Sequence, residues 1–289
     1  MAEDAYLLGL VGTGTTPSLT PALHIAEGLA QGFACVYRPI DLSVLDIDPE
    51  RLPEILDWAE RLGFDALNIT HPCKRQVIAY LDRVDPVAEA LGSVNTVRFT
   101  AEGRIGYNTD TTGFERAFRN GLAGAPTERV VQLAAGGAGA AVADALLRIG
   151  ARQLTVVDIE FERARELAEQ LASRHDAQVR AAAAAELPGL LAEADGLVHC
   201  SPVGMRHHPG IPLDAELLHS RLWVADIVYR PLETELLRAA KAMGCRTLHG
   251  GAMAVGQAID TFRIVTGRDP DPERMDRHFQ SLITDEEAR

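Results

Sequence analysis

Short apolar runs alternate with helical patterns along the first third of the chain. The runs have the length and residue content of strands. They cover Tyr6–Val11, Cys35–Leu42, Ala66–Ile69, Val94–Phe99 and Arg104–Tyr107. The helical patterns, Pro21–Gln31 and Pro49–Leu62, each begin with a proline and are followed by a glycine, as helices commonly are. The turn at Glu102-Gly103 predicts an antiparallel hairpin, so we expect the first sheet to be mixed.

The pattern changes near Glu128, where strand-like runs alternate with helical segments in a βαβ order. The runs are Val130–Leu133, Leu154–Val157, Gly196–His199 and Val224–Val228. Between the first two lie the small residues of 134–139 and an Ala-rich amphipathic helix that ends at Gly150. This order predicts a Rossmann-like parallel sheet.

The two patterns predict an α/β chain of two domains. Residues 1–110 together with 251–289 are expected to form an N-terminal mixed-sheet domain, because the helical pattern Gly251–Thr266 is placed to return to it. Residues 111–250 are expected to form the Rossmann-like domain.

The composition is that of a folded globular chain. Of the 289 residues, 47% are hydrophobic and 24% are charged, which argues against disorder and fibrous repeats. The net charge of -13 disfavours nucleic acid and anionic membrane surfaces as partners. No apolar stretch approaches the roughly 20 residues of a membrane span. The start Met1–Asp4 lacks the basic residues of a secretory signal, so we expect a cytoplasmic protein.

The four cysteines are scattered along the chain. Cys35, Cys73, Cys200 and Cys245 form no CxxC pair and have no histidine at metal-binding spacing. We therefore expect reduced thiols and no metal site. The sequence carries no signal for oligomeric state, and a homodimer is compatible with it.

The segment after the Val130–Leu133 run is a candidate phosphate-binding loop. It reads Ala134-x-Gly136-x-x-Gly139, with Gly137 and Ala138 inside it. A strand that runs through small residues into a helix presents free backbone N–H groups and the positive end of the helix dipole to a pyrophosphate. The first glycine of the dinucleotide fingerprint is replaced by alanine, and a tight turn into a helix is the alternative interpretation.

Asp158 stands at the end of the next predicted strand, where dinucleotide-binding folds place an acid on the adenosine ribose. A carboxylate there accepts hydrogen bonds from ribose hydroxyls and repels a 2'-phosphate, which favours NAD over NADP. Arg163 and Arg165 follow on the next helix and are candidates for holding a phosphate. Helix-face pairs with nearby glutamates are their alternative role.

Three polar clusters follow strands or precede helices in the first half of the chain. They supply the Ser18 and Thr20 hydroxyls, the Lys74 amine and the Asp110 carboxylate, while Asn95 interrupts a β-branched strand. Polar groups at strand ends are where α/β folds build their sites. If each residue is considered alone, helix capping is an alternative role for Ser18, Thr20 and Asp110. A solvent-exposed side chain without a specific role is the alternative for Lys74.

Together the clusters resemble the shikimate dehydrogenase family, most closely its NAD-dependent quinate/shikimate dehydrogenases, over nearly the whole chain. The segments that carry the resemblance are Ser18–His24, Asn68–Lys74, Gly92–Thr96, Asn108–Phe114, the glycine loop, Ser201–Met205 and Gly250–Ala258.

The resemblance implies roles for individual residues. Lys74 and Asp110 would be the catalytic pair. The substrate's carboxylate and ring hydroxyls would be held by Ser18, Thr20, Asn68, Thr70, Asn95 and Gln257. The cofactor-binding set would comprise Gly136, Gly137, Ala138, Gly139, Asp158, Arg163, Val203, Met205, Val228 and Gly251.

Departures from the family pattern bear on specificity. Many shikimate-only members carry a serine where Thr20 stands and a basic residue where Asp158 stands, so both positions point to the quinate-using branch. The expected substrate is a hydroxylated cyclic carboxylic acid. An aromatic is common at the position of Cys73, and we have no physical account of that change.

The expected reaction is reversible hydride transfer between a ring alcohol of quinate or shikimate and NAD. Lys74 and Asp110 would act as one hydrogen-bonded unit on the reacting hydroxyl. The alternatives within enzymes are an NADP-linked biosynthetic shikimate dehydrogenase and an amino-shikimate dehydrogenase. The alternative of another class is a catalytically silent NAD sensor.

Overall fold

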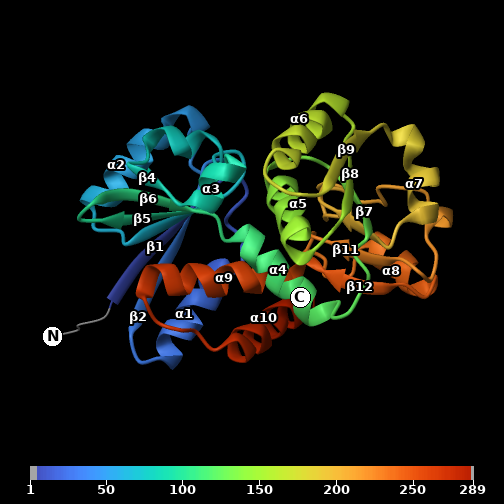
Figure 1. Ribbon diagram of the computed structural model, residues 1–289. Coiled ribbons are helices and arrows are strands. Elements are labelled where there is room, and N and C mark those ends of the chain that lie inside the picture. The colour runs from blue at the N-terminus through green and yellow to red at the C-terminus, as the bar shows by residue number, and fades with distance from the viewer. Residues whose placement is uncertain (1–4, 288–289) are drawn as a thin grey trace. The chain divides into compact units, whose positions relative to one another are not determined.

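The first half of the chain builds a mixed six-stranded sheet, as predicted, in the strand order β2-β1-β3-β5-β6-β4. The strands are β1 (Ala5–Gly12), β2 (Ala34–Asp41), β3 (Ala66–Ile69), β4 (Arg83–Val84), β5 (Thr96–Thr100) and β6 (Gly103–Tyr107). β1 is parallel to β2 and β3, whereas β5 runs antiparallel to β3 and β6. Figure 1 shows this computed structural model, which describes residues 5–287.

Five helices accompany this sheet. They are α1 (Thr20–Ala30), α2 (Leu52–Arg61), α3 (Pro86–Leu91), α9 (Gly250–Thr266) and α10 (Pro272–Glu287). α2 turns Leu52, Leu56 and Ala59 inward at helical spacing against the buried strand residues Leu67 and Ile69. Each fully buried leucine stabilises the fold by about 1.5–3 kcal/mol, so this apolar face holds α2 to the sheet.

The second sheet is entirely parallel, with the strand order β12-β11-β10-β7-β8-β9. Its strands are β7 (Arg129–Leu133), β8 (Gln153–Val157), β9 (Gln178–Ala182), β10 (Gly196–His199), β11 (Trp223–Asp226) and β12 (Arg246–His249). Its helices are α4 (Asp110–Gly121), α5 (Gly137–Ile149), α6 (Phe161–Ala172), α7 (Leu187–Glu193) and α8 (Glu235–Ala242). The chain therefore has the predicted α/β fold, with one mixed and one parallel sheet.

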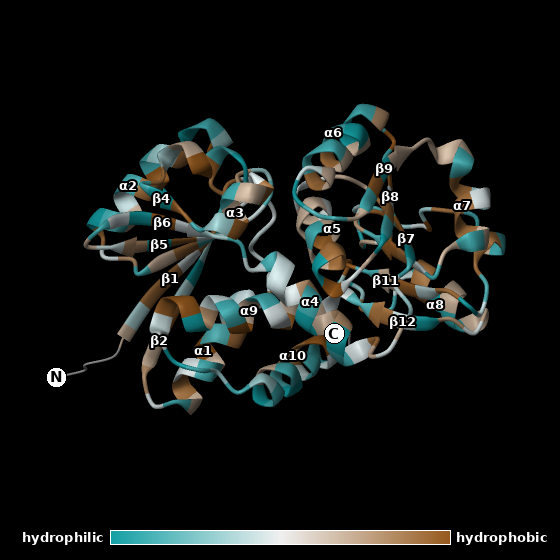
Figure 2. Cartoon of the chain, viewed as in Figure 1, coloured by the Kyte–Doolittle hydropathy of each residue, from teal (hydrophilic) through white to brown (hydrophobic). Residues whose placement is uncertain are grey.

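The chain divides into two compact units. One comprises residues up to Thr109 together with those from Val255 onward, and the other comprises Asp110–Ala254. Helix α9 begins in the second unit and continues in the first. Each unit has its own core, and Figure 2 shows brown, apolar segments on the strands of both and teal, hydrophilic residues along much of α10.

Several element boundaries differ from the expected ones. The strand expected at Val94 begins at Thr96, because the backbone N–H of Val94 bonds to the Lys74 carbonyl in the turn after β3 and not to a neighbouring strand. The helix expected from Pro49 opens with a 3-10 turn over Pro49–Arg51. Strands β4, β9 and β12 were not predicted, because β4 has only two residues and β9 and β12 carry polar residues that weaken the apolar pattern.

Residues 1–4, on which the expectation about a secretory signal rests, and residues 288–289 lie outside the described part of the chain. Among residues 5–287 no helix combines the length and apolar character needed to cross a membrane.

Candidate functional site

The predicted phosphate loop connects β7 to α5. Gly136 is the N-cap residue of α5, which begins at Gly137. A Cβ placed on Gly139 would lie 2.4 Å from the carbonyl oxygen of Ala134, so only glycine fits there. The loop thus packs strand and helix closely and leaves the first-turn N–H groups of α5 at its mouth, as a pyrophosphate site requires.

Ala134 occupies the first position of the fingerprint in a left-handed conformation, with φ of 77°. This conformation explains why glycine is preferred at the position: a Cβ there costs on the order of 1 kcal/mol. The strain is held in place by a hydrogen bond of 2.7 Å from Ala134 N to the Val157 carbonyl. The alanine therefore raises the conformational energy of the loop, but the backbone of the loop keeps the same path.

Asp158 is fixed against this loop. Its Oδ2 accepts a hydrogen bond from Ala135 N at 2.7 Å and its Oδ1 accepts from Glu160 N at 2.9 Å. The half-buried carboxylate therefore stands beside the phosphate loop at the end of β8, where an adenosine ribose would lie. Arg163 is exposed and pairs with Glu160 at 2.9 Å, so its observed partner is the carboxylate of the N-cap residue of α6.

Arg165 likewise pairs along its own helix, with Glu162 at 2.7 Å and Glu169 at 2.6 Å. Exposed ion pairs of this kind contribute less than about 1 kcal/mol to the stability of the fold. Both arginines thus have local glutamate partners, Arg163 at the N-cap of α6 and Arg165 on the helix itself.

The remaining predicted cofactor residues follow neighbouring strands of the parallel sheet. Val203 and Met205 follow β10, Val228 follows β11, and Gly251 lies in the first turn of α9 after β12. Carboxyl ends of parallel strands share one edge of a sheet, and this edge is where α/β folds bind ligands. The fold therefore gathers these residues, the glycine loop and Asp158 at one edge.

A buried histidine organises the turn after β10, a feature that the sequence did not reveal. His199 Nδ1 lies 3.0 Å from Asp226 Oδ1, and its Nε2 lies 2.5 Å from Ser201 Oγ. Asp226 also accepts hydrogen bonds from Thr234 Oγ1 and Val228 N. The network joins β10 to β11 and fixes the start of the Ser201–Met205 segment.

In the first unit, Ser18 and Thr20 lie at the start of α1, where Thr20 N donates to Ser18 Oγ at 3.3 Å. The loop before them is held by Asp41 at the end of β2. The Asp41 carboxylate accepts hydrogen bonds from Gly14 N at 2.9 Å, Thr16 N at 2.8 Å, Thr16 Oγ1 at 2.9 Å and Ser43 Oγ at 2.6 Å.

Burial alone would raise the pKa of Asp41. The hydrogen bonds that it accepts from Ser43, Thr16 and Gly14 outweigh burial and hold the pKa of this carboxyl well below its usual range. Asp41 is therefore ionised at neutral pH and anchors the loop that presents Ser18 and Thr20.

Asn68 lies at the end of β3 inside a buried polar network. Its Oδ1 accepts from the Tyr37 hydroxyl, and its Nδ2 donates to the Asn95 carbonyl at 3.1 Å and to Thr96 Oγ1 at 2.9 Å. Both amide hydrogens are thus engaged within the protein. Toward a ligand, Asn68 has only acceptor capacity left on its oxygen.

Lys74 lies in the turn after β3, and its backbone is bonded to Val94, the residue before Asn95. The turn begins with Thr70, whose carbonyl accepts from Cys73 N at 2.9 Å, and the Lys74 carbonyl accepts from Val94 N at 2.9 Å. Asn95 then contacts Thr109: its Nδ2 donates to Thr109 Oγ1 at 2.9 Å, and its Oδ1 accepts from Thr109 N at 2.9 Å. The fold thus brings Thr70, Lys74, Asn68 and Asn95 together at the ends of β3 and β5.

Asp110, the first residue of α4, is buried and directly follows Thr109. Gln257 lies on α9 in the first unit. No group of three or more His, Cys, Asp or Glu side chains within residues 5–287 is arranged to hold a metal ion.

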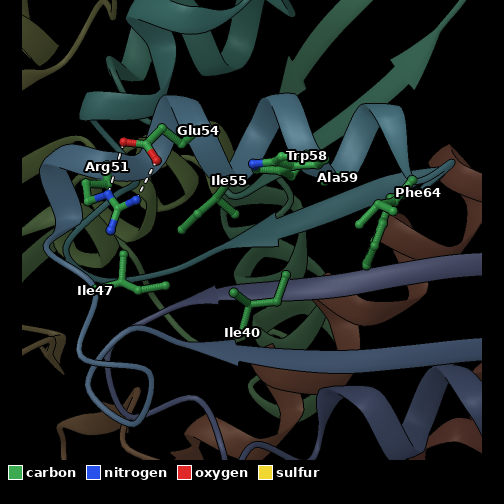
Figure 3. Close-up of a pocket in the computed structure, with 9 residues that line it drawn as sticks. Ile40, Ile47, Arg51, Glu54, Ile55, Trp58, Ala59 and Phe64 are labelled. Atoms are coloured by element: carbon green, nitrogen blue, oxygen red, sulfur yellow. Dashed lines mark hydrogen bonds and ion pairs between the residues drawn. The ribbon is translucent and has the colours of Figure 1, made fainter.

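An apolar groove on α2 lies apart from these residues. Figure 3 shows Ile40, Ile47, Ile55 and Trp58 around it, with the Arg51–Glu54 ion pair at one end. None of the predicted site residues lines it. It is therefore separate from the candidate site.

Comparison with known proteins places the chain in a family. Residues 10–97 match the shikimate dehydrogenase substrate binding domain. The chain is 56% identical to a shikimate dehydrogenase (NADP(+)) from Pseudarthrobacter chlorophenolicus, covering 99% of this chain and 98% of that protein. It is 47% identical to a quinate/shikimate dehydrogenase (NAD(+)) from Corynebacterium efficiens, covering 98% of this chain and all of the relative.

A solved structure shares the fold over almost the full length. Quinate dehydrogenase from Corynebacterium glutamicum, in complex with NAD, superposes with a TM-score of 0.90 at 47% identity and covers 96% of this chain and 100% of that chain. The chain belongs to the shikimate dehydrogenase family of oxidoreductases, which includes quinate/shikimate dehydrogenases.

Proposed function

We propose that the protein is an NAD-dependent dehydrogenase that interconverts quinate or shikimate and their 3-dehydro ketones. The single observation that carries the cofactor choice is Asp158, whose carboxylate is fixed beside the glycine loop by Ala135 N and Glu160 N. A fixed carboxylate receives ribose hydroxyls and repels a 2'-phosphate. The relatives named as NAD enzymes, at 47% identity, are consistent with this choice.

The competing proposal is an NADP-linked shikimate dehydrogenase. It is favoured by the names of relatives at 56% and 58% identity. Arg163 and Arg165 are candidates for binding a 2'-phosphate, but each is already paired with a nearby glutamate. Recruiting them would break those pairs and leave the Asp158 repulsion in place. The geometry therefore favours NAD.

The substrate site is proposed to hold a hydroxylated ring acid. Ser18 and Thr20 would hold its carboxylate, and Thr70, Asn95 and Gln257 would donate to ring hydroxyls. Asn68, with both amide hydrogens engaged, would accept a hydrogen bond from a ring hydroxyl. A site built of such groups discriminates against analogues that leave them unpaired. Small aliphatic alcohols are therefore expected to be poor substrates.

NAD, when bound, supplies the hydride acceptor. Lys74 and Asp110 would then form one unit on the reacting hydroxyl, taking up its proton as the alcohol is oxidised and returning it in the reverse direction. The glycine loop fits the pyrophosphate because a side chain at Gly139 would collide with the Ala134 carbonyl. The substrate-binding role belongs in this proposal to the first unit, and the dinucleotide-binding role to the second.

The test is a matrix of initial rates on the purified protein, with NAD and NADP each paired with shikimate, quinate and amino-shikimate. The fixed carboxylate predicts a kcat/KM for NAD at least about tenfold above that for NADP, a difference of about 1.4 kcal/mol. Asp158→Ser should narrow this ratio, while the control Asp48→Asn, at an exposed cap distant in sequence, should leave it unchanged. A wild-type preference for NADP would overturn the cofactor assignment. Tight NAD binding without turnover of any substrate would instead favour a catalytically silent NAD sensor.

A further inference from the structure

A ring of four side-chain hydrogen bonds lies buried in the first unit, where Thr261 of α9 meets residues at the start of β5 and just after β6. Its members are Asn95, Thr96, Thr109 and Thr261, each no more than 4% exposed. Asn95 Nδ2 lies 2.9 Å from Thr109 Oγ1, and Thr109 Oγ1 lies 3.2 Å from Thr261 Oγ1. Thr261 Oγ1 lies 3.3 Å from Thr96 Oγ1, which lies 3.0 Å from Asn95 Oδ1.

The amide of Asn95 sets the direction of the whole ring. Its nitrogen only donates and its oxygen only accepts. Asn95 Oδ1 accepts from Thr109 N at 2.9 Å and Thr96 Oγ1 at 3.0 Å, both shorter than its 3.3 Å separation from Thr109 Oγ1. The Thr109 proton therefore goes to Thr261, and the Thr261 proton goes to Thr96. Hydrogen bonds that follow one another in a single direction polarise and strengthen each other.

We propose that Thr261 is a positioning residue for the dehydrogenase reaction, because its hydroxyl closes this ring and so holds the Asn95 amide in one orientation. The inference rests on the proposed function, in which Asn95 binds a ring hydroxyl. The ring also includes Thr109, the residue directly before Asp110. Thr261 itself lies one helical turn after Gln257, so its hydroxyl ties the helix carrying Gln257 to the strand ends.

Loss of the Thr261 hydroxyl has a specific consequence. Thr96 Oγ1 loses the Thr261 donor but keeps Asn68 Nδ2 at 2.9 Å, and Thr109 Oγ1 loses the Thr261 acceptor. Within the ring, the Thr109 hydroxyl is then left with Asn95 Oδ1, 3.3 Å away, which already accepts two hydrogen bonds. The Asn95 amide keeps its direct hydrogen bonds to Thr109 and Thr96 but loses the closed ring that strengthens them, so we expect it to orient a substrate hydroxyl less well.

The experiment compares Thr261→Val, which keeps the side-chain shape without the hydroxyl, with Thr261→Ser, which keeps the hydroxyl. Thr261→Val should lower kcat/KM for shikimate or quinate at least about tenfold without changing the KM for NAD, while Thr261→Ser stays within about threefold of wild type. The matched control is Thr266→Val on the same helix, whose hydroxyl donates to the Phe262 carbonyl outside the ring. It should leave kcat/KM unchanged.

A double-mutant cycle separates positioning from a general packing effect. In an Asn95→Ala background, Thr261→Val should cost less than about twofold, since the group that Thr261 positions is gone. The inference is overturned if Thr261→Val alone leaves kcat/KM within twofold of wild type. It is equally overturned if the loss persists in the Asn95→Ala background or is matched by Thr266→Val.

A second readout is independent of turnover. The side-chain amide protons of Asn95, followed by NMR, should exchange slowly with solvent in wild type and Thr261→Ser and at least about tenfold faster in Thr261→Val. Unchanged exchange would refute the ring. A wild-type protein without turnover on any substrate and cofactor pair, but with this exchange pattern, would contradict the proposed function and leave the ring established.

Discussion

At the residue scale, His24 combines full burial with two ring nitrogens that have no hydrogen-bond partner among the described residues. It packs on α1 between Tyr37 and Phe262, with ring centroids 5.2 Å and 6.0 Å away. Burial lowers the pKa of His24 to about 4, against the smaller opposite effect of Glu27. The imidazole is therefore neutral in the folded protein at neutral pH.

This burial predicts a pH dependence of stability. The unfolded chain binds a proton at His24 below about pH 6.5 and the folded chain only near pH 4, so unfolding takes up a proton between these values. The free energy of unfolding should therefore fall as pH is lowered from 6.5 to 4, by about 3 kcal/mol from this group at 1.4 kcal/mol per pKa unit.

His24→Phe should remove that part of the slope, measured by urea unfolding at pH 7 and pH 5. The exposed His207→Phe serves as the control and should keep the wild-type slope. An unaltered slope in His24→Phe would show that His24 does not stay neutral on folding.

At the element scale, the loop between β1 and α1 takes its course from a distant carboxylate. The Asp41 carboxylate at the end of β2 accepts hydrogen bonds from Gly14 and Thr16, and no sequence pattern in the loop predicts this contact. Hydroxyls at Ser18 and Thr20 could therefore be recognised from sequence, but the residue that holds their loop could not. The same holds for Thr261, which meets Thr96 from 165 positions away.

Asp41→Asn is expected to raise the KM for the ring acid by about tenfold, because an amide nitrogen cannot accept the hydrogen bonds that one carboxylate oxygen takes from Thr16. The KM for NAD should not change, since Asp41 belongs to the first unit. Asp48→Asn, at an exposed cap that follows the same strand, is the control. An equal rise in the KM for the ring acid in both variants, or no rise in Asp41→Asn, would contradict the role of Asp41 in holding this loop.

At the scale of the whole molecule, the order of strands and helices was predictable because hydrophobic periodicity is a local signal. The mixed and parallel sheets follow from the Glu102-Gly103 turn and the βαβ order. Of the strands that were not predicted, β4 has only two residues, and β9 and β12 lie at the two ends of the parallel sheet, where Gln178, Arg180 and Arg246 are exposed and weaken the apolar pattern. The candidate site residues could be proposed as a set from the sequence, whereas their hydrogen-bond partners depend on contacts that only the fold creates.

We propose above all that Lys74, as one unit with Asp110, takes part in proton transfer in an NAD-linked dehydrogenase. The chain has two lysines, Lys74 and the exposed Lys241, which pairs with Glu233 at 2.6 Å. The most direct test is the turnover number of Lys74→Ala with NAD and shikimate or quinate, beside Lys241→Ala. We expect kcat to fall at least about 100-fold in Lys74→Ala, with the Kd for NAD unchanged and Lys241→Ala fully active. Turnover of Lys74→Ala near the wild-type rate would contradict the account.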